Sequence, residues 1–222
     1  SIGGSMVPTL GNKLVEQYGI PVAFIPCAKG GTSLLGIHND WSKRNESNPA
    51  DRSNMYGNSI YRARAVGGIE LIVMNQGEHD VSDKTPGEDY EKAFRKLFDN
   101  YQKDLGYHVP LFYGQLGASG HSAFVGKDDV MTGIRTAQYN CDNGEDFLMA
   151  TTEFDLAKNP DDLHYTTKSQ SILGERMANA IRYYYGDSTY YRGPELQSAA
   201  FIDDTKKELL VSVRHFGGSD LT

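Results

Sequence analysis

The sequence predicts an α/β domain in which a parallel β-sheet lies between two layers of helices. Short apolar segments of strand length alternate with amphipathic segments of helical length along most of the chain. Polar and glycine-rich loops follow the apolar segments, and in parallel sheets ligands bind at the carboxyl ends of the strands. The 222 residues suffice for one such domain and a short remainder.

Five segments have the pattern of amphipathic helices. In the first, Pro8 suits the opening turn and Gly19 provides the stop, with apolar residues at helical spacing between them. The clearest is the third, in which aromatic and leucine side chains share one face. The predicted helices are residues 7–18, 51–66, 86–105, 128–139 and 167–185.

Nearly continuous apolar runs predict strands that are buried on both faces, as in parallel sheets. The runs are residues 20–27 (IPVAFIPC), 69–74 (IELIVM), 109–116 and 147–151. Together with the helices they define a main domain over residues 1–186.

The character of the chain changes after residue 186. Residues 187–194 have the composition of a linker, and residues 199–202 and 208–213 are predicted strands around a polar turn. Two strands alone are marginally stable. We therefore expect residues 195–222 to be the beginning of a truncated β domain.

Charge and composition exclude several classes of partner. The net charge is −7 and the basic residues are scattered, which argues against nucleic acid or an anionic membrane as the main partner. No apolar run reaches the roughly 18 residues of a transmembrane helix. Cys27 and Cys141 show neither metal-ligand spacing nor a disulfide framework.

Four loops carry residues suited to chemistry. They are Ser1 to Ser5, Gly30-Gly31-Thr32, Asn75 to Asp80, and Asp161-Asp162-Leu163-His164. In the last, a carboxylate three residues before a histidine can accept the Nδ1 proton and leave Nε2 facing a nucleophile. Alternatively, the motif is a solvated loop before a helix and has no catalytic role.

Taken together, these loops resemble the sequence blocks of the SGNH hydrolases, especially the carbohydrate acetylesterase branch with sialate O-acetylesterase-like and acetyl xylan esterase-like enzymes. Ser1-Ile2 resembles the end of the Gly-Asp-Ser-Leu/Ile block, and Gly30-Gly31-Thr32 resembles the glycine block. Residues 77–80 resemble the Gly-x-Asn-Asp block, and residues 161–164 the Asp-x-x-His block. Gln76-Gly77-Glu78 also resembles the branch's Gln-Gly-Glu signature. The resemblance spans residues 1 to about 186 and implies a flavodoxin-like three-layer fold.

The resemblance implies a Ser-His-Asp triad of Ser1, His164 and Asp161. It further implies an oxyanion hole that includes the backbone N–H of Gly30, with Gly31, Trp41 and Glu78 at the substrate. Trp41 could stack on a sugar, although a lone tryptophan is more often part of the core.

The chain departs from the family pattern in two places. No strand precedes Ser1, so the resemblance implies that the first strand lies upstream. Ser5 is then a rival nucleophile, with Ser1 preferred because it leaves the family's usual short gap before the first helix. His79 stands where the family has Asn, so the third oxyanion donor is either Gln76 or His79.

The expected function is removal of acyl groups, most simply acetyl, from a carbohydrate through an acyl-enzyme. No metal or organic cofactor is required, and the resemblance points to an extracellular or particle-surface setting. The alternatives are a lipase or thioesterase of the same fold, or a carbohydrate-binding domain without activity. A hydrolase that uses the amine of Ser1 as its base is disfavoured by the alternating strands and helices.

Overall fold

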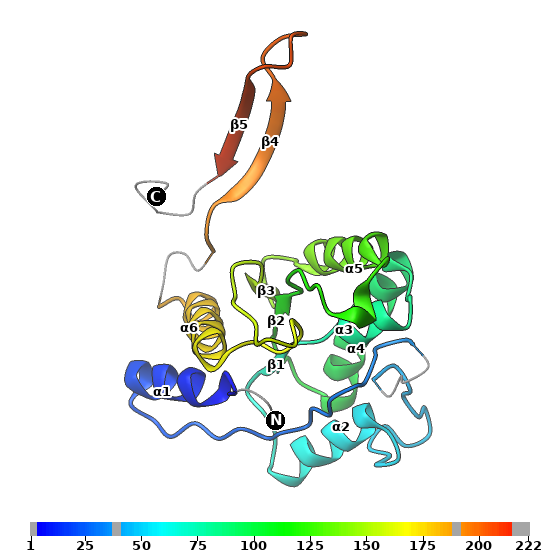
Figure 1. Cartoon of the computed structure of the whole chain (residues 1–222). Coiled ribbons are helices and arrows are strands. Elements are labelled where there is room, and N and C mark those ends of the chain that lie inside the picture. The colour runs from blue at the N-terminus through cyan, green and yellow to red at the C-terminus, as the bar shows by residue number, and fades with distance from the viewer. Residues whose placement is uncertain (1–3, 37–40, 188–191, 215–222) are drawn as a thin grey trace.

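The computed structural model describes residues 4–36, 41–187 and 192–214, and its centre is a parallel sheet (Figure 1). The sheet consists of β1 (Ile72–Met74), β2 (Leu111–Gln115) and β3 (Phe147–Thr152) in the order β1-β2-β3. In its register, Val73 lies opposite Phe112, and Phe112 lies opposite Leu148. Every residue of β2 is buried, as expected for a strand covered on both faces.

Helices cover both faces of this sheet, which confirms the predicted α/β/α architecture. One face carries α1 (Val7–Tyr18) and α6 (Thr167–Tyr184), whose apolar side chains form a core with Phe112 and Leu148. The other face carries α4 (Gly87–Leu105) and α5 (Asp128–Cys141), with α2 (Met55–Ala65) beside α4. The second core includes Leu111 and Tyr113, the neighbours of Phe112 on β2, because successive side chains of a strand point to opposite faces.

Helix boundaries follow from local capping. Gly19 ends α1 with a left-handed φ of 65° and donates its N–H to the carbonyl of Val15. The hydroxyl of Thr166 accepts the N–H of Ser169 and starts α6. The predicted bounds of α1 are confirmed, whereas residues 51–66 contract to α2 and residues 69–74 contract to β1. Two short elements were not predicted, α3 (Glu78–Ser82) and the 3-10 turn Ser122–Phe124.

The prediction of a strand at residues 20–27 is wrong. The segment forms no strand, and each of its residues is exposed or half-buried. An extended segment becomes a strand only where a neighbour completes its hydrogen bonds. Among the described residues β1 pairs only with β2, so no ladder reaches this segment.

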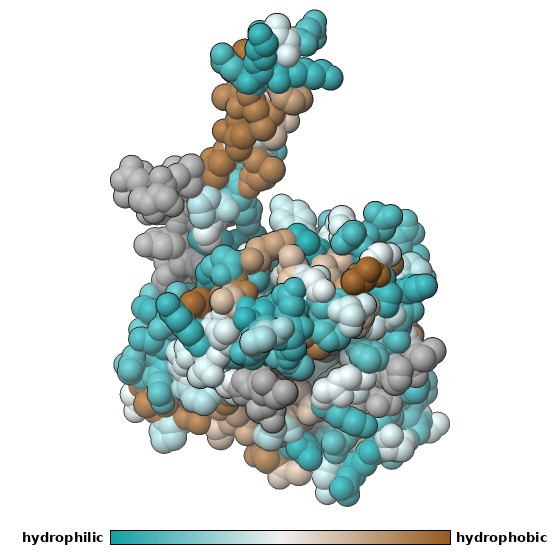
Figure 2. All heavy atoms as spheres, viewed as in Figure 1, coloured by the Kyte–Doolittle hydropathy of each residue, from teal (hydrophilic) through white to brown (hydrophobic). Residues whose placement is uncertain are grey.

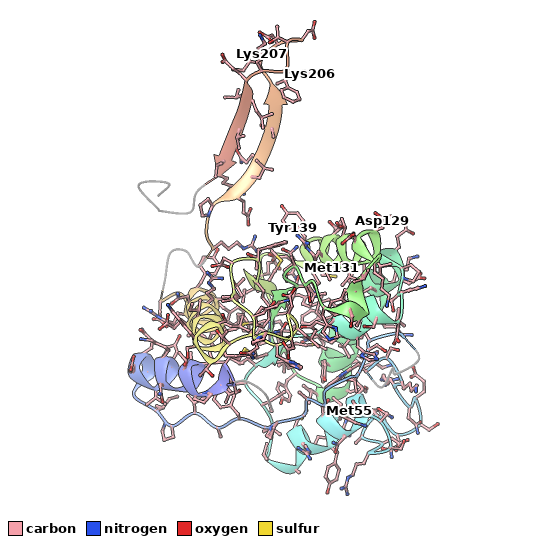
Figure 3. The ribbon with its side chains drawn as sticks, viewed as in Figure 1. Met55, Asp129, Met131, Tyr139, Lys206 and Lys207 are labelled. Atoms are coloured by element: carbon pink, nitrogen blue, oxygen red, sulfur yellow. The ribbon has the colours of Figure 1, made fainter. Side chains whose placement is uncertain are left out.

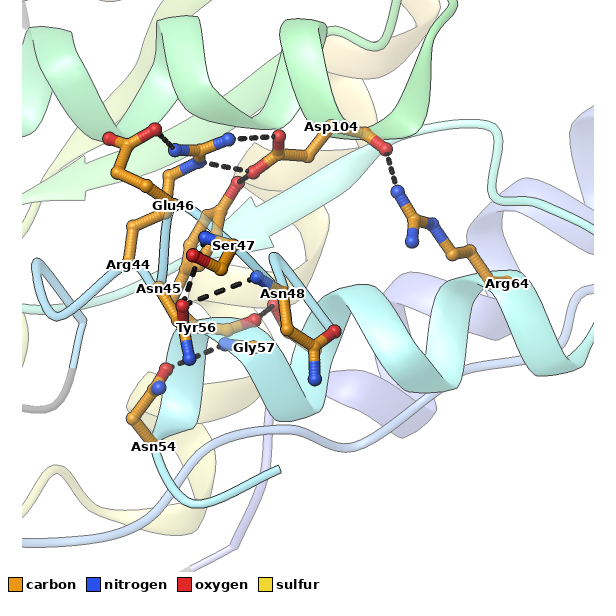
Figure 4. A network of polar contacts seen from close by, with 11 residues as sticks. Arg44, Asn45, Glu46, Ser47, Asn48, Asn54, Tyr56, Gly57, Arg64 and Asp104 are labelled. Carbon is orange, nitrogen blue, oxygen red and sulfur yellow. Dashed lines mark hydrogen bonds and ion pairs between the residues drawn. The ribbon is translucent and has the colours of Figure 1, made fainter. Parts of the chain in front are cut away.

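The segment after Trp41 is held to the end of α4 by a buried ion pair (Figure 4). The Arg44 guanidinium donates to both carboxylate oxygens of Asp104, at 2.6 and 2.7 Å, and the Tyr56 hydroxyl donates to the same group at 2.6 Å. Burial raises the pKa of Asp104, but the hydrogen bonds from Arg44 and Tyr56 outweigh it and leave the pKa below its usual value.

A hairpin of β4 (Glu195–Phe201) and β5 (Leu209–Arg214) projects away from the three layers (Figure 1). The strands predicted at residues 199–202 and 208–213 are confirmed, with β4 beginning earlier. Lys206 and Lys207 lie at the tip of the hairpin (Figure 3). At its base, Arg192 forms an ion pair with Asp142, which follows α5. Whether these residues begin a β domain stays a prediction.

Among the described helices, none is long and apolar enough to cross a bilayer.

Candidate active site

The loops that follow β1, β2 and β3 meet at the carboxyl edge of the sheet, because the three strands are parallel. These loops contain residues 75–80, 116–121 and 153–165. Hydrogen bonds between residues far apart in sequence connect the second and third of these loops.

Asp161 and His164 form a hydrogen-bonded pair on the loop after β3. Asp161 Oδ2 lies 2.7 Å from His164 Nδ1, and Asp161 Oδ1 accepts the N–H groups of Leu163 and His164, each at 3.0 Å. The side-chain hydrogen bond of His164, followed by these two backbone donors, lowers the pKa of Asp161 to about 2. An ionised carboxylate only accepts, so Nδ1 carries the proton and Nε2 is left as the basic nitrogen. The side chain of His164 is 58% exposed and therefore open to a substrate.

The Asp161–His164 loop is fastened to the loop after β2. Asp162 has a left-handed φ of 51°, and its Oδ2 accepts the N–H of Gly120 at 2.7 Å. Its carbonyl accepts the hydroxyl of Ser119, and Lys158 Nζ donates to the carbonyl of Ala118 at 2.5 Å. The sequence motif contains Asp162 but does not predict this role, although an aspartate is one of the few residues that tolerate this backbone conformation.

The first described residues lie against the start of α6, close in sequence to His164. A Cβ at Gly4 would stand 3.0 Å from Thr167 Cγ2. Ser5 Oγ accepts the N–H of Val7 at 3.2 Å, a contact typical of a serine at a helix start. Ser1, the preferred nucleophile, lies outside the described residues.

In the glycine loop, Gly31 has a backbone conformation that favours glycine over other residues. Gly31 has a φ of 74°, and a Cβ at either Gly30 or Gly31 would meet no atom within 4 Å. The loop is closed by the Thr32 hydroxyl, which donates to the carbonyl of Lys29 at 2.8 Å. The backbone N–H groups of the residues that follow, Leu34 and Leu35, are bound by Asp80.

The structure supports the core interpretation of Trp41 over a stacking role. The side chain is 9% exposed and packs in the core on the α4 face of the sheet. Its indole N–H donates to the hydroxyl of Thr32 at 3.3 Å, which places the polar edge of the ring beneath the glycine loop. Trp41 is therefore a support of that loop and presents no open face to a sugar.

The two candidates for the third oxyanion donor occupy different environments. Gln76 is 8% exposed, and its Nε2 lies 2.5 Å from Asp80 Oδ2. His79 is half-buried, with Nε2 3.9 Å from Oδ1 of Asp83, the residue that follows this short helix. The amide of Gln76 is therefore buried against a carboxylate, whereas the ring of His79 is half-buried.

Two acidic residues at this edge of the sheet, Glu78 and Glu153, have raised pKa values. Glu153, directly after β3, is 1% exposed, and neither of its oxygens has a hydrogen-bond partner of regular geometry among the described residues. Burial, and then the charge of Glu78, raises the pKa of Glu153 to about 8, although the Tyr165 hydroxyl and the Asn75 side chain lie close enough to lower it. Burial also raises the pKa of Glu78 and lowers the pKa of Lys158. The positive charge of Lys158 acts on both acids and lowers their pKa values. Glu78 is part of the motif after β1, whereas no motif marks Glu153. The signal that could have revealed Glu153 is a charged residue directly after a buried strand.

The remaining histidines and cysteines form no further site in the described part of the chain. His108 lies 3.5 Å from Asp146, His121 Nδ1 accepts the N–H of Ala123, and the two cysteines are free thiols. No group of three or more His, Cys, Asp or Glu side chains suited to a metal occurs among the described residues.

Comparisons with known proteins identify the family. The model of the carbohydrate esterase, sialic acid-specific acetylesterase family matches residues 3–183. A carbohydrate acetylesterase from Xanthomonas citri superposes with a TM-score of 0.70 at 18% identity, over 96% of this chain and 47% of that chain. A protein from Arabidopsis thaliana superposes with a TM-score of 0.61 at 25% identity, over 80% of this chain and 66% of that chain.

This chain thus spans about half the length of the Xanthomonas protein (47%) and 66% of the Arabidopsis one. No curated protein sequence matches it. The family match covers the three layers and the loops that follow β1, β2 and β3. The chain belongs to the sialic acid-specific acetylesterase family of carbohydrate esterases.

Proposed function

We propose that this chain is the catalytic part of a serine esterase that removes acetyl groups from a carbohydrate. The observation that carries the proposal is the Asp161–His164 pair, with 2.7 Å between Oδ2 and Nδ1, at the carboxyl edge of the sheet in a chain of this family. The description of the Xanthomonas protein as a carbohydrate acetylesterase supports the substrate class.

The chemistry is acyl transfer in two halves. A serine Oγ attacks the ester carbonyl carbon while His164 Nε2 takes the hydroxyl proton. The tetrahedral intermediate collapses, and His164 returns that proton to the departing sugar oxygen. Water then attacks the acyl-serine with His164 again as base, which releases acetate and restores the serine. Asp161 stabilises the histidine in its charged form during both halves.

Ser1 is the nucleophile we propose, with Ser5 as the alternative. The placement of Gly4 beside Thr167 supports a nucleophile in this segment, because Thr167 is only three residues beyond His164. The hydrogen bond from the N–H of Val7 gives Ser5 a structural role of its own, which favours Ser1.

The oxyanion would be held by the N–H of the nucleophile, the N–H of Gly30 and the side-chain amide of Gln76. Loss of one such donor typically lowers the rate by about a hundredfold or more. An acetylated carbohydrate suits the polar loops described above better than a long acyl chain does. We further propose an extracellular or particle-surface setting for this activity.

The test is acetate release from 4-nitrophenyl acetate, acetylated xylan and acetylated sialic acid by the full protein that carries these residues. We expect His164→Ala and Ser1→Ala to be inactive and Ser5→Ala to retain activity. Labelling with a fluorophosphonate followed by peptide mass spectrometry identifies the reactive serine directly. Modification of Ser5 would move the nucleophile and keep the function, whereas a folded parent protein inactive on every ester would contradict the esterase proposal.

A further inference from the structure

Asp80 is a fully buried carboxylate that joins two loops at the carboxyl edge of the sheet. It is 0% exposed and lies on α3, after β1. Its oxygens accept the N–H groups of Leu34 at 2.6 Å and Leu35 at 3.0 Å, which are more than forty residues away in sequence. They also accept Gln76 Nε2 at 2.5 Å and the Thr85 hydroxyl at 3.1 Å. These four donors are neutral, and the hydrogen bonds are what makes burial of the carboxylate tolerable.

Contacts on both sides fix the side-chain amide of Gln76. Nε2 donates to Asp80, and Oε1 accepts the hydroxyl of Tyr90 at 2.8 Å. The carbonyl of Gln76 accepts Gln138 Nε2 at 2.9 Å, which holds its backbone as well. A flipped amide would set Oε1 against the carboxylate of Asp80, so only one orientation is stable. Since Nε2 carries two hydrogens, one remains to donate elsewhere.

The same carboxylate holds the glycine loop. Leu34 and Leu35 follow Gly30 and Gly31 closely, and their N–H groups end on Asp80. One buried side chain therefore anchors both segments from which oxyanion donors are proposed, the loop of Gly30 and the amide of Gln76. An oxyanion hole depends on donors that are in place before the reaction begins.

We propose that Asp80 is a positioning residue of the oxyanion hole, which holds the glycine loop and turns the Gln76 amide so that its second N–H donates to the oxyanion. The inference rests on the proposed esterase function. It assigns the third donor to Gln76 and gives His79 no part in the hole.

The test compares Asp80→Asn with Thr85→Val in the full protein, using kcat and KM for 4-nitrophenyl acetate together with the melting temperature. Asn retains the shape of Asp80, but its Nδ2 cannot accept, so one pair of donors is lost. Thr85→Val removes a hydrogen bond from the same carboxylate without touching either loop. We expect Asp80→Asn to lower kcat by roughly tenfold to a hundredfold with KM little changed, and Thr85→Val to keep the kcat of the parent.

A double-mutant cycle separates positioning from general destabilisation. If Asp80 acts through Gln76, the kcat of the Asp80→Asn/Gln76→Ala double variant should stay well above the value that two independent losses predict. Multiplicative losses, or an Asp80→Asn variant with the kcat of the parent, would overturn the inference while leaving the esterase function intact. An inactive parent protein would overturn both.

A measurement on the unmutated protein covers the case in which Asp80→Asn does not fold. The side-chain amide of Gln76 is assigned by comparison with Gln76→Ala in 1H–15N spectra, before and after formation of a phosphonate adduct on the serine. We expect one Gln76 hydrogen, bound to Asp80, to keep its shift and the other to move strongly downfield as it meets the adduct's oxygen. An adduct that leaves both hydrogens unmoved would contradict the proposed role.

Discussion

Two carboxyl groups on the loop after β3, those of Glu153 and Asp161, lie in opposite environments. The pKa of Asp161 is lowered to about 2 by its hydrogen bonds to His164 and the backbone, whereas burial raises that of Glu153 to about 8. The first group is suited to hold a histidine in one orientation. The second is buried without a regular hydrogen-bond partner among the described residues, and it should weaken the fold when it ionises.

The raised pKa of Glu153 predicts a stability that falls as pH rises. The pKa of this carboxyl is near its ordinary value of 4.5 in the unfolded chain and about 8 in the folded one. Between these values the folded state binds more protons, so the free energy of unfolding decreases with rising pH. We expect Glu153→Gln to melt at a higher temperature than the parent near pH 8, with the difference shrinking toward pH 5. Glu175→Gln, at an exposed position on α6, is the control, and identical pH profiles for parent and Glu153→Gln would contradict the prediction.

The hydrogen bond between Asp161 and His164 predicts that a substitution of Asp161 lowers the activity without unfolding the protein. In Asp161→Asn the amide can no longer hold Nδ1–H as an ionised acceptor, and His164 is free to adopt the other tautomer. We expect kcat on 4-nitrophenyl acetate to fall by a factor on the order of 10² to 10⁴, with little change in melting temperature. Near-parental kcat in Asp161→Asn would remove Asp161 from the catalytic group.

At the scale of loops, the hydrogen bond from the Gly120 N–H to Asp162 holds the loop of Asp161 and His164 against the loop after β2. Asp162→Ala removes the acceptor of the Gly120 N–H and places alanine at a φ of 51°, whereas Asp162→Asn retains an acceptor and tolerates that conformation. We expect the alanine variant to lose activity and to exchange the Gly120 amide faster, while the asparagine variant stays close to the parent. Activity is measured by kinetics and the exchange rate of the Gly120 amide by NMR. Equal activity and equal exchange in the two variants would contradict this role of Asp162.

Helices pack closely where glycine removes the side chain. A Cβ at Gly174 on α6 would lie 2.5 Å from the carbonyl oxygen of Met6, at the start of α1, whereas a Cβ at Gly133 on α5 would meet its nearest atom, Gly87 Cα, at 3.4 Å. We expect Gly174→Ala to destabilise the protein by about 1–3 kcal/mol. Gly133→Ala should be neutral or slightly stabilising, because alanine is the better helix former. Urea unfolding measures both, and a stabilised Gly174→Ala would show that α1 and α6 are not in contact as described.

At the scale of the whole molecule, the hairpin presents one apolar face. The pairing places Leu196 opposite Val213, Ala199 opposite Val211 and Phe201 opposite Leu209, and all six side chains share one side. The opposite side is mixed, with Glu195 opposite Arg214 and Ser198 opposite Ser212, but Ala200 opposite Leu210. The brown surface of the hairpin in Figure 2 reflects these exposed apolar residues. A sheet with one apolar face is suited to a second layer, which supports our proposal that the residues from 195 onward begin a β domain.

The exposed face predicts self-association of this chain. We expect light scattering and binding of a hydrophobic dye to decrease when Phe201 and Val211 are both replaced by lysine. Ser198→Lys, on the opposite side of the hairpin, should leave both signals unchanged. Equal dye binding by all three proteins would show that the face is covered in solution.

The sequence by itself determined the elements whose signals are local. The helices α1, α4, α5 and α6 follow from apolar periodicity and their capping residues, and β2 and β3 from buried runs. The Asp161–His164 pair could also be predicted, since its partners are three residues apart and one loop suffices to join them.

Only the tertiary structure decided the rest. Residues 20–27 are not a strand, and Asp80 joins segments more than forty residues apart. Burial makes Trp41 a core residue and keeps Glu153 from ionising easily. Strand pairing, burial and the pKa of a buried acid all depend on segments distant in sequence, so no local pattern can reveal them.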